Sequence, residues 1–468
     1  MLYDKLKKYS KSGVYPFHMP GHKRNTALSD GTMPYEIDLT EIDGFDNLHN
    51  AEGCILEVQN LAERLYNVKK AFLLVNGATG GILSAVRAMT NRGDKVLVAR
   101  NSHKSVYNAL EICGLEPEYI VPAVDDEFGI NCSITPLQVE KTIVENPNTK
   151  LLIITSPTYE GVVSDIKEIC RIAHLHNVMV LVDEAHGAHF PFSKSFPSEA
   201  VASGADAAVA SLHKTLPSLT QTALLLTSNE SLINSLAENL AIFETSSPSY
   251  IFMSAIEKCL EFCENASAFD EYIKRLNSFN EKCKSLKKIK VLCYGNDEVK
   301  NHRFFDFDIS KITVSVRRLD INGTQLAEIL RNDFKIEPEM VCSDYVLLIS
   351  TVCDTDEGFA RLINALQIID SKCSVKELNA YRYSIAIPKI SVKPCECSGK
   401  DGEFCLLEHS IDKISLEYVW AYPPGIPIIA KGEIITQDIA NIIIAQIASG
   451  INVCSTKGKI PKEIYCCI

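Results

Sequence analysis

Short apolar runs alternate with longer amphipathic segments from about residue 53 to residue 227. Continuous apolar runs such as 95–99 and 178–182 predict strands that are buried on both faces of a sheet. Apolar residues at helical spacing between these runs predict covering helices. Strands are expected at 73–75, 95–99, 119–122, 151–155, 178–182, 206–210 and 223–226, and helices are expected from 53 onward and at 76–88, 105–113, 136–145 and 166–176. This alternation predicts an α/β fold with a mostly parallel seven-stranded sheet and helices on both faces.

The character of the chain changes at three points, which predicts four parts. Residues 1–55 contain no long periodic segment and are expected to form an N-terminal arm. Residues 56–286 hold the alternating pattern and end in a long helical region interrupted at 244–250. Residues 287–377 predict a small α+β domain, and 378–468 a C-terminal domain. In these two domains strands are expected at 311–316 and 345–349, and helices at 324–333, 355–366 and 436–450.

Charge and apolar content narrow the classes of function. The net charge is −12 and no block of basic residues is present, which argues against nucleic acid as the main partner. No run approaches 18 uncharged apolar residues, and the polar N-terminus lacks the apolar core of a secretory signal. We therefore expect a cytoplasmic protein without a membrane partner.

The chain has 17 cysteines, many of them beside apolar residues. In a reducing compartment such cysteines behave as small buried hydrophobes and form no disulfides. Four potential zinc ligands lie close together in sequence, but their spacing fits no common zinc module, so we expect no metal. They are Cys395, Cys397, Cys405 and His409.

Lys214 is the strongest candidate for chemistry. It follows the apolar run 206–210 and precedes the run 223–226. A lysine between two buried strands is costly as an unpaired cation. It is reasonable if its amine is used covalently, for example as a Schiff base with an aldehyde cofactor. A lysine on an exposed turn is the alternative.

Three features upstream of Lys214 favour the cofactor interpretation. Asp183 ends a buried strand, where an acid can keep a pyridinium N–H protonated. The turn at 76–81 can hold a phosphate through its backbone N–H groups and the Thr79 hydroxyl. His103 follows another strand and can stack on an aromatic ring. Each feature alone has a structural explanation as a cap, a turn or a core histidine. Their shared position at strand ends predicts one site.

The stretch Ser211-Leu212-His213-Lys214 with 220–223 resembles the pyridoxal-phosphate lysine signature of the Orn/Lys/Arg decarboxylases. That family belongs to the aspartate-aminotransferase fold superfamily. Three further stretches are similar to the same family, namely 17–23 (FHMPGHK), 38–50 (DLTEI with LHN) and 422–427 (YPPGIP). The sequence departs from the family pattern at Pro217 and at 430–433, where Pro-Gly-Glu is usual. Neither departure involves a residue that carries chemistry.

The resemblance implies a large fold type I domain of the PLP-dependent transferase type, smaller C-terminal domains, and pyridoxal 5'-phosphate (PLP) bound covalently to Lys214. The catalytic residues that it implies are Lys214, His103, Asp183 and His213. In this interpretation Asp183 keeps the nitrogen of the cofactor ring protonated, and His186 orients Asp183 or the ring. Thr245 and Ser246 reach the cofactor phosphate of a neighbouring subunit. The full set of expected cofactor-binding residues is Ala78, Thr79, Gly80, His103, Asp183, His186, Ser211, His213, Lys214, Thr245 and Ser246.

The activity implied by the resemblance is decarboxylation of a basic L-amino acid in polyamine metabolism. We rank arginine first (giving agmatine), lysine second (giving cadaverine) and ornithine third (giving putrescine). Glu433 and Asp46 are candidates for binding the cationic end of the substrate. The resemblance also implies a homo-oligomer, at least a dimer, with an active site shared between subunits.

Two other classes of function remain open. The first is a different PLP enzyme, such as an aminotransferase or a carbon–sulfur lyase. An aminotransferase needs an arginine for the substrate carboxylate, and Arg317 or Arg361 can serve. The second is a non-catalytic protein that binds the cofactor or a partner. Fold-level analogy alone does not decide between these classes.

Overall fold

The computed structural model describes every residue except 26, 28–31, 293–302, 377–387, 423–424 and 468. The chain divides into two compact units. The first unit contains Met1–Met89 and Val180–Phe269, and the second contains Thr90–Met179 and Asp270–Ile468. The boundaries predicted near residues 55, 286 and 377 remain predictions.

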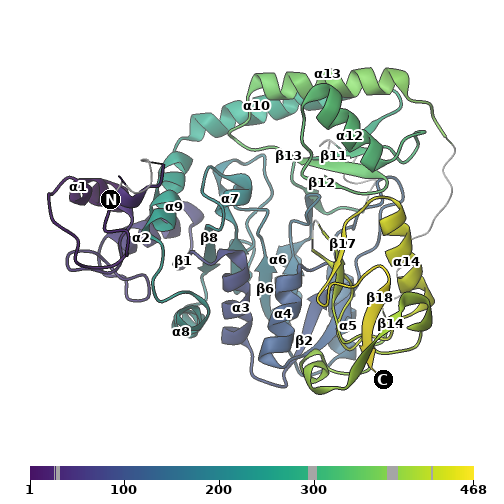
Figure 1. Cartoon of the computed structure of the whole chain (residues 1–468), viewed down its shortest axis with the longest axis horizontal. Helices are drawn as coiled ribbons and strands as arrows, with labels where there is room; N and C mark the ends of the chain where they lie inside the picture. Colours follow the sequence, from purple (N-terminus) through teal and green to yellow (C-terminus); the bar gives the residue numbers. More distant parts are fainter. Residues whose placement is uncertain (26, 28–31, 293–302, 377–387, 423–424, 468) are drawn as a thin grey trace. The chain divides into compact units, whose positions relative to one another are not determined.

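The first unit is built on strands β1, β8, β7 and β6, which are consecutive in the sheet. β6 pairs with β7 in parallel, whereas β8 pairs antiparallel with both β7 and β1. Helices α3 and α8 pack against each other in this unit (Figure 1). The elements are α1 (Leu2–Ser10), α2 (Cys54–Tyr66), β1 (Lys70–Leu74), α3 (Gly77–Met89), β6 (Met179–Asp183), β7 (Ala207–Ala210), α7 (Leu212–Thr215), β8 (Ala223–Thr227), α8 (Ile233–Phe243) and α9 (Tyr250–Cys263), with 3₁₀ helices η2 (Tyr35–Ile37), η3 (Phe190–Phe192) and η4 (Glu230–Leu232).

A small residue lets α3 approach the sheet closely. A Cβ atom at Gly81 would lie 2.6 Å from Leu74 Cδ1 and 3.1 Å from Val209 Cγ1, so a side chain does not fit there. Close packing of this kind is a recognised role of glycine in helices that follow a ligand-binding turn. It brings the first turn of α3 toward the end of β7.

The N-terminal arm contains a helix that the sequence pattern did not predict. In α1 the side chains of Leu2 and Leu6 are fully buried, and the helix contacts α2 and α9 (Figure 1). The helix is only 9 residues long and carries three lysines, so its apolar face consists of two leucines. A periodicity argument needs a longer window than this.

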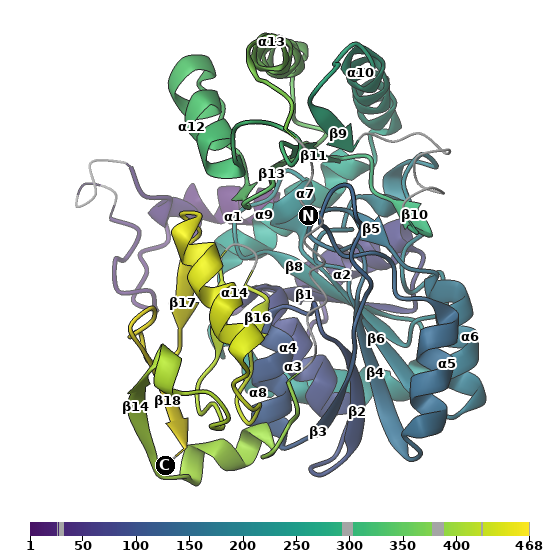
Figure 2. The same ribbon diagram turned by 90° about the vertical axis from the view of Figure 1, so that its right-hand side faces the viewer.

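The second unit contains strands β4, β2 and β3, with parallel pairing of β2 to both neighbours. It also contains a four-stranded sheet of order β12-β13-β11-β9. Helices α10, α12 and α13 lie on the same side of that sheet, as Figure 2 shows, and share an apolar core with it. The elements of this part are β2 (Lys95–Ala99), α4 (Lys104–Cys113), β3 (Glu116–Ile120), α5 (Pro136–Glu145), β4 (Thr149–Thr155), β5 (Val162–Val163), α6 (Ile166–Leu175), α10 (Ala266–Cys283), β9 (Lys290–Leu292), β10 (Asp306–Phe307), β11 (Lys311–Ser315), α12 (Gly323–Phe334), β12 (Met340–Val341), β13 (Tyr345–Ile349) and α13 (Asp356–Lys372).

The C-terminal segment, residues 388–467, forms a separate small core within the second unit. Its strands pair as β14-β18 and as β16-β15-β17, and α14 contacts the second group. Ile429, Ile439 and Ile443 are buried in this core. The elements are η5 (Pro394–Gly399), β14 (Gly402–Leu406), η6 (Leu407–His409), β15 (Val419–Ala421), β16 (Pro427–Ile429), α14 (Gln437–Ala448), β17 (Val453–Ser455) and β18 (Glu463–Cys467).

The predicted fold class is confirmed. The strands form a seven-stranded mixed sheet of order β1-β8-β7-β6-β4-β2-β3. The predicted helical region after β8 is interrupted at 244–249, as expected, and a second time at 264–265 between α9 and α10. None of the helices formed by the described residues combines the length and apolar character needed to cross a bilayer.

Candidate active site

Lys214 lies where β7 gives way to a single helical turn. Ser211 is the N-cap residue of α7, and Lys214 is half-buried within that turn. The Lys214 Nζ atom is 3.1 Å from Nε2 of His186, which is buried. An ammonium group can only donate a hydrogen bond, so a protonated Lys214 requires Nε2 of His186 to act as the acceptor. Lys214 and His186 are therefore in direct contact in the first unit.

Asp183 is the last residue of β6, on the strand adjacent to the one that leads to Lys214. It pairs in register with Val209 of β7, so the two parallel strands end at the same edge. The Asp183 carboxylate is buried and accepts a hydrogen bond from the Ala185 N–H (3.2 Å). Burial raises the pKa of Asp183, and the positive charge of Lys214 opposes that rise. A cation near this carboxylate favours its ionised form.

Ser211 presents a buried polar atom that the protein does not satisfy. Its Oγ has no hydrogen-bond partner among the described residues, and the residue is fully buried. A buried hydroxyl without a partner costs free energy unless a ligand or water completes it. This hydroxyl therefore fits a bound anionic group at the start of α7.

The turn between β1 and α3 holds the other expected phosphate contacts. Gly77 has a φ of +73°, a conformation that favours glycine, and α3 begins there. Ala78 is half-buried, Thr79 is exposed and Gly80 is buried in the first turn of this 13-residue helix. The backbone N–H groups of a first helical turn are suited to an anion.

Two side chains that sequence reasoning missed hold this turn in place. Glu244 Oε1 accepts the Val75 N–H (2.9 Å), and Gln221 Nε2 donates to the Val75 carbonyl (2.6 Å). The Asn76 side chain donates to the Phe243 carbonyl (3.1 Å). Gln221 lies in the stretch that carries the family resemblance, but no sequence pattern tells that its side chain reaches Val75.

His213 and the loop after α8 complete the expected residues of the first unit. His213 Nδ1 is 2.9 Å from the Thr222 carbonyl, which can only accept, so the ring carries a proton on Nδ1. Partial burial lowers the pKa of His213, which favours a neutral ring with Nε2 as a proton acceptor. Thr245 and Ser246 are both exposed, and the Thr245 carbonyl accepts from His49 Nε2 (2.9 Å).

His103 belongs to the second unit, where it is the N-cap of α4. Its Nδ1 accepts the Ser105 N–H (3.2 Å) and lies 2.9 Å from Ser105 Oγ. The first unit therefore has Asp183, His186, Ser211 and Lys214 at the ends of β6 and β7. His103 contacts Ser105 within the second unit. The roles expected for all these residues stay predictions.

One carboxylate oxygen of Glu433 is engaged by protein partners. Its side chain is fully buried, and Oε2 lies 3.2 Å from Arg100 Nη2 and 2.7 Å from the Ala430 N–H, which it accepts. The expectation that Glu433 binds the substrate cation stays a prediction, since Oε1 has no hydrogen-bond partner among the described residues. The acid neutralises the guanidinium of Arg100, whose side chain is 11% exposed.

The Asp46 carboxylate is likewise engaged, by backbone N–H groups around the start of α2, whose N-cap residue is Gly53. Its oxygens accept backbone N–H groups from Glu52, Gly53, Ile55 and Leu56 at 2.8–3.3 Å. These hydrogen bonds outweigh burial and lower the pKa of Asp46. The carboxylate satisfies the unpaired N–H groups at the start of α2, so it is not available as a substrate ligand.

The two arginines considered for an aminotransferase also have protein partners. Arg317 donates to the Asp126 carbonyl and lies 3.6 Å from Asp344, and Arg361 pairs with Glu357 one turn earlier on α13. The four potential zinc ligands do not gather. The described part of the chain contains no group of three or more His, Cys, Asp or Glu side chains suited to a metal ion. In the YPPGIP stretch, Pro423 and Pro424 lie outside the described residues.

Comparison with known proteins identifies the family. The model of the Orn/Lys/Arg decarboxylase major domain matches residues 1–354. The arginine decarboxylases of Bacillus subtilis (strain 168) and Bacillus anthracis are each 32% identical over 465 residues, covering 97% of this chain and 94% of theirs. Among solved structures, a lysine decarboxylase of Francisella novicida superposes with a TM-score of 0.84 at 17% identity, over 100% of this chain and 81% of that one. At that identity the likeness concerns the fold alone.

Proposed function

The chain belongs to the Orn/Lys/Arg decarboxylase family and is a decarboxylase of a basic amino acid, and we propose that its preferred substrate is L-arginine and its cofactor is PLP. The observation that carries the choice of arginine is the likeness to two arginine decarboxylases over almost the whole of both chains. The product is then agmatine, a cationic amine that can enter polyamine synthesis. Lysine ranks second and ornithine third.

The residues at the ends of β6 and β7 fit PLP. A phosphate needs hydrogen-bond donors, and the buried Ser211 hydroxyl has no partner among the residues that the structure describes. A pyridinium N–H needs a buried acid, and Asp183 is one. An aldehyde needs an amine, and Lys214 lies in the same unit. Enzymes of this family and fold depend on PLP, which adds support.

The proposed division of roles follows from this donor set. When bound, PLP accepts the electron pair that remains on the substrate as CO2 leaves. Asp183 keeps a proton on the ring nitrogen, since an opposite charge favours its ionised form in spite of burial. The amine of Lys214 is the covalent attachment point, and its Nζ lies within hydrogen-bond distance of His186 Nε2, at 3.1 Å. We propose that His103 lies against the face of the ring.

The phosphate is held, in this proposal, by the start of α3 and by Ser211. The N–H groups of Ala78 and Gly80 and the Thr79 hydroxyl supply donors at a helix N-terminus. His213 directs a proton during product formation or, when its ring is protonated, adds a phosphate contact through Nε2–H. Its Nδ1–H is committed to Thr222, so Nε2 is the atom that accepts a proton.

We further propose a homo-oligomer, at least a dimer, in which Thr245 and Ser246 reach the cofactor phosphate of the neighbouring subunit. Both residues are exposed on a loop of the first unit. The N-terminal stretch supplies apolar surface of the kind that subunit contacts cover, because Tyr15, Phe17 and Met19 are 70%, 90% and 65% exposed. Light scattering after gel filtration measures the oligomer directly, and a monomeric active enzyme would refute the shared site.

Amine product identification tests the substrate. The purified chain is loaded with PLP and fed an equimolar mixture of L-arginine, L-lysine and L-ornithine, and the products are identified by mass. Agmatine is the expected product, and Lys214→Ala is the inactive control. Cadaverine or putrescine as the main product would overturn arginine. Release of a keto acid that depends on 2-oxoglutarate would favour an aminotransferase, and cofactor binding without turnover would favour a non-catalytic role.

A further inference from the structure

A glycine of the C-terminal segment lies against the ring of His103. A Cβ atom at Gly425 would lie 3.3 Å from both Cδ2 and Nε2 of His103, which is tighter than ordinary contact. The Gly425 carbonyl also accepts the Lys104 N–H (3.1 Å), the first backbone donor of α4. Gly425 therefore touches both the N-cap side chain of α4 and the backbone that follows it.

The other edge of the ring is held by Ser105. Nδ1 accepts the Ser105 N–H, and an N–H group cannot accept, so the neutral ring of His103 carries its proton on Nε2. That protonated edge faces Gly425. The position of the imidazole is thus set from one side by its own helix and from the other by the C-terminal segment.

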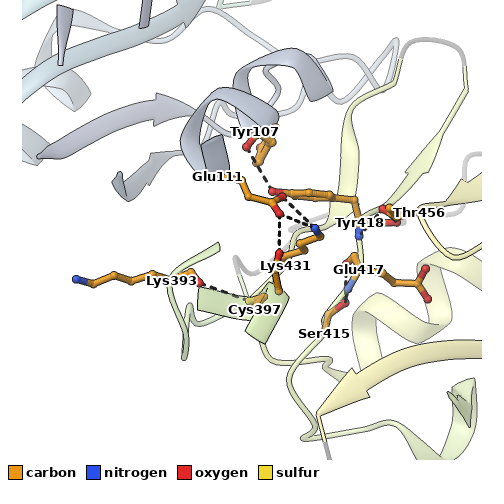
Figure 3. A network of polar contacts seen from close by, with 10 residues as sticks. Tyr107, Glu111, Lys393, Cys397, Ser415, Glu417, Tyr418, Lys431 and Thr456 are labelled. Atoms are coloured by element: carbon orange, nitrogen blue, oxygen red, sulfur yellow. Dashed lines mark hydrogen bonds and ion pairs between the residues drawn. The ribbon is translucent and has the colours of Figure 1, made fainter. Parts of the chain in front are cut away.

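The C-terminal segment is anchored by charged side chains to α4 and to Arg100, which lies four residues before that helix. Lys431 Nζ lies 2.8 and 3.0 Å from the two carboxylate oxygens of Glu111, and Figure 3 shows this pair beside Tyr418. Arg100 donates to the Pro427 carbonyl (2.9 Å) and pairs with buried Glu433. These contacts hold the segment that carries Gly425 on both ends of α4.

We propose that Gly425 is a positioning residue for His103, and that the absence of a side chain at this point lets the imidazole adopt the orientation needed against the cofactor ring. This proposal rests on the proposed function, in which His103 faces PLP. It assigns a role to the glycine of the 422–427 stretch, which the sequence marked only by its resemblance to the family. Gly425 has a φ of +88°, so glycine is favoured there for its backbone as well as for the space.

A matched pair of variants separates the two reasons for glycine. Gly425→Ala introduces backbone strain and a methyl group against the imidazole. Gly458→Ala, in the same C-terminal segment, has a comparable φ of +73° but nothing within 4 Å of the new Cβ. Both variants should lower the midpoint of thermal unfolding, because both place alanine at a positive φ. Only Gly425→Ala should disturb His103.

The readouts are the visible absorbance and circular dichroism of the bound cofactor, together with kcat and KM for L-arginine. For Gly425→Ala we expect an altered cofactor spectrum and a kcat lowered roughly tenfold with KM nearly unchanged, because a misplacement of less than 1 Å at the reacting centre lowers the rate on this scale. Gly458→Ala should keep the wild-type spectrum and kcat. Should Gly425→Ala fail to fold, Gly425→Asn and Gly458→Asn replace the pair, since asparagine tolerates positive φ better.

The outcomes are distinguishable. A wild-type spectrum and kcat in the variant at 425, or equal losses in both variants, would overturn the positioning role. A wild-type chain that shows no cofactor band and no amine product would refute the proposed function itself, and the role of Gly425 with it. A change confined to the variant at 425 supports the proposal.

Discussion

Glu244 is a buried acid whose titration should make the free energy of unfolding depend on pH. Its side chain is buried where α8 ends and accepts the N–H of Val75, directly before the turn at 76–81. It lines a pocket of about 230 Å³ in which the charged or titratable neighbours are His49 and Lys70. Replacing it by glutamine keeps the shape and one acceptor oxygen but removes the charge.

The size of the effect follows from the pKa. Burial raises the pKa of Glu244 from 4.5 to about 7. Hydrogen bonds from the backbone N–H groups of Val75 and Asn76, and the charge of His49, oppose that rise. At about 1.4 kcal/mol per pKa unit this difference corresponds to about 3 kcal/mol. The folded state binds the proton more tightly, so the contribution is complete below pH 4.5 and is lost as the pH rises to about 7.

Urea unfolding measures the contribution of Glu244 to the free energy of unfolding. It is followed by far-ultraviolet circular dichroism at one protein concentration and at pH 5, 6, 7 and 8. The free energy of unfolding of wild type minus that of Glu244→Gln should fall by roughly 2–3 kcal/mol across the series, because the subtraction cancels the other titrating groups. Glu238→Gln, an exposed position on the same helix, should give a flat difference. A difference for Glu244→Gln that is flat within about 0.5 kcal/mol would refute the buried-acid reasoning.

Three further predictions concern the site and its surroundings. Asp183→Asn should retain cofactor absorbance yet lose roughly 100- to 1,000-fold in kcat, the scale of a lost electrostatic contact, and normal turnover would remove Asp183 from the mechanism. Borohydride reduction followed by peptide mapping should find the cofactor on Lys214, and an adduct on another lysine would contradict the proposed attachment. Glu433→Ala should lower the free energy of unfolding by about 3–5 kcal/mol because it leaves the largely buried Arg100 without its carboxylate, and Arg100→Met combined with Glu433→Leu should recover much of that loss. A higher KM for arginine in Glu433→Ala with unchanged stability would instead make Glu433 a substrate ligand.

Much of the secondary structure could be predicted because its causes are local. The strand 95–99 and the helix 136–145 have the predicted bounds exactly as β2 and α5. The strand is a continuous apolar run, and the helix starts at Pro136 behind the capping box of Thr135 and Gln138. The position of Asp183 at a strand end follows from the same local information.

The candidate carboxylates illustrate what local information omits. Asp46 and Glu433 are equally plausible substrate ligands in the sequence, because an acid near a family motif carries no mark of its partner. Glu433 pairs with Arg100, which is 333 positions away, and Asp46 turns back onto the helix that follows it. Glu244, which sequence reasoning passed over, meets Val75 across 169 positions.

The amino-acid sequence by itself determined the alternation of strands and helices, the strand-end positions of Lys214 and Asp183, and the family to which the chain belongs. Only the tertiary structure decided which acids have protein partners, that Leu2 and Leu6 of a short N-terminal helix are buried, and that Gly425 lies against His103. The physical reason is that apolar periodicity and capping act over a few residues. Charge pairing, burial and close contact depend on which distant segments the fold brings together.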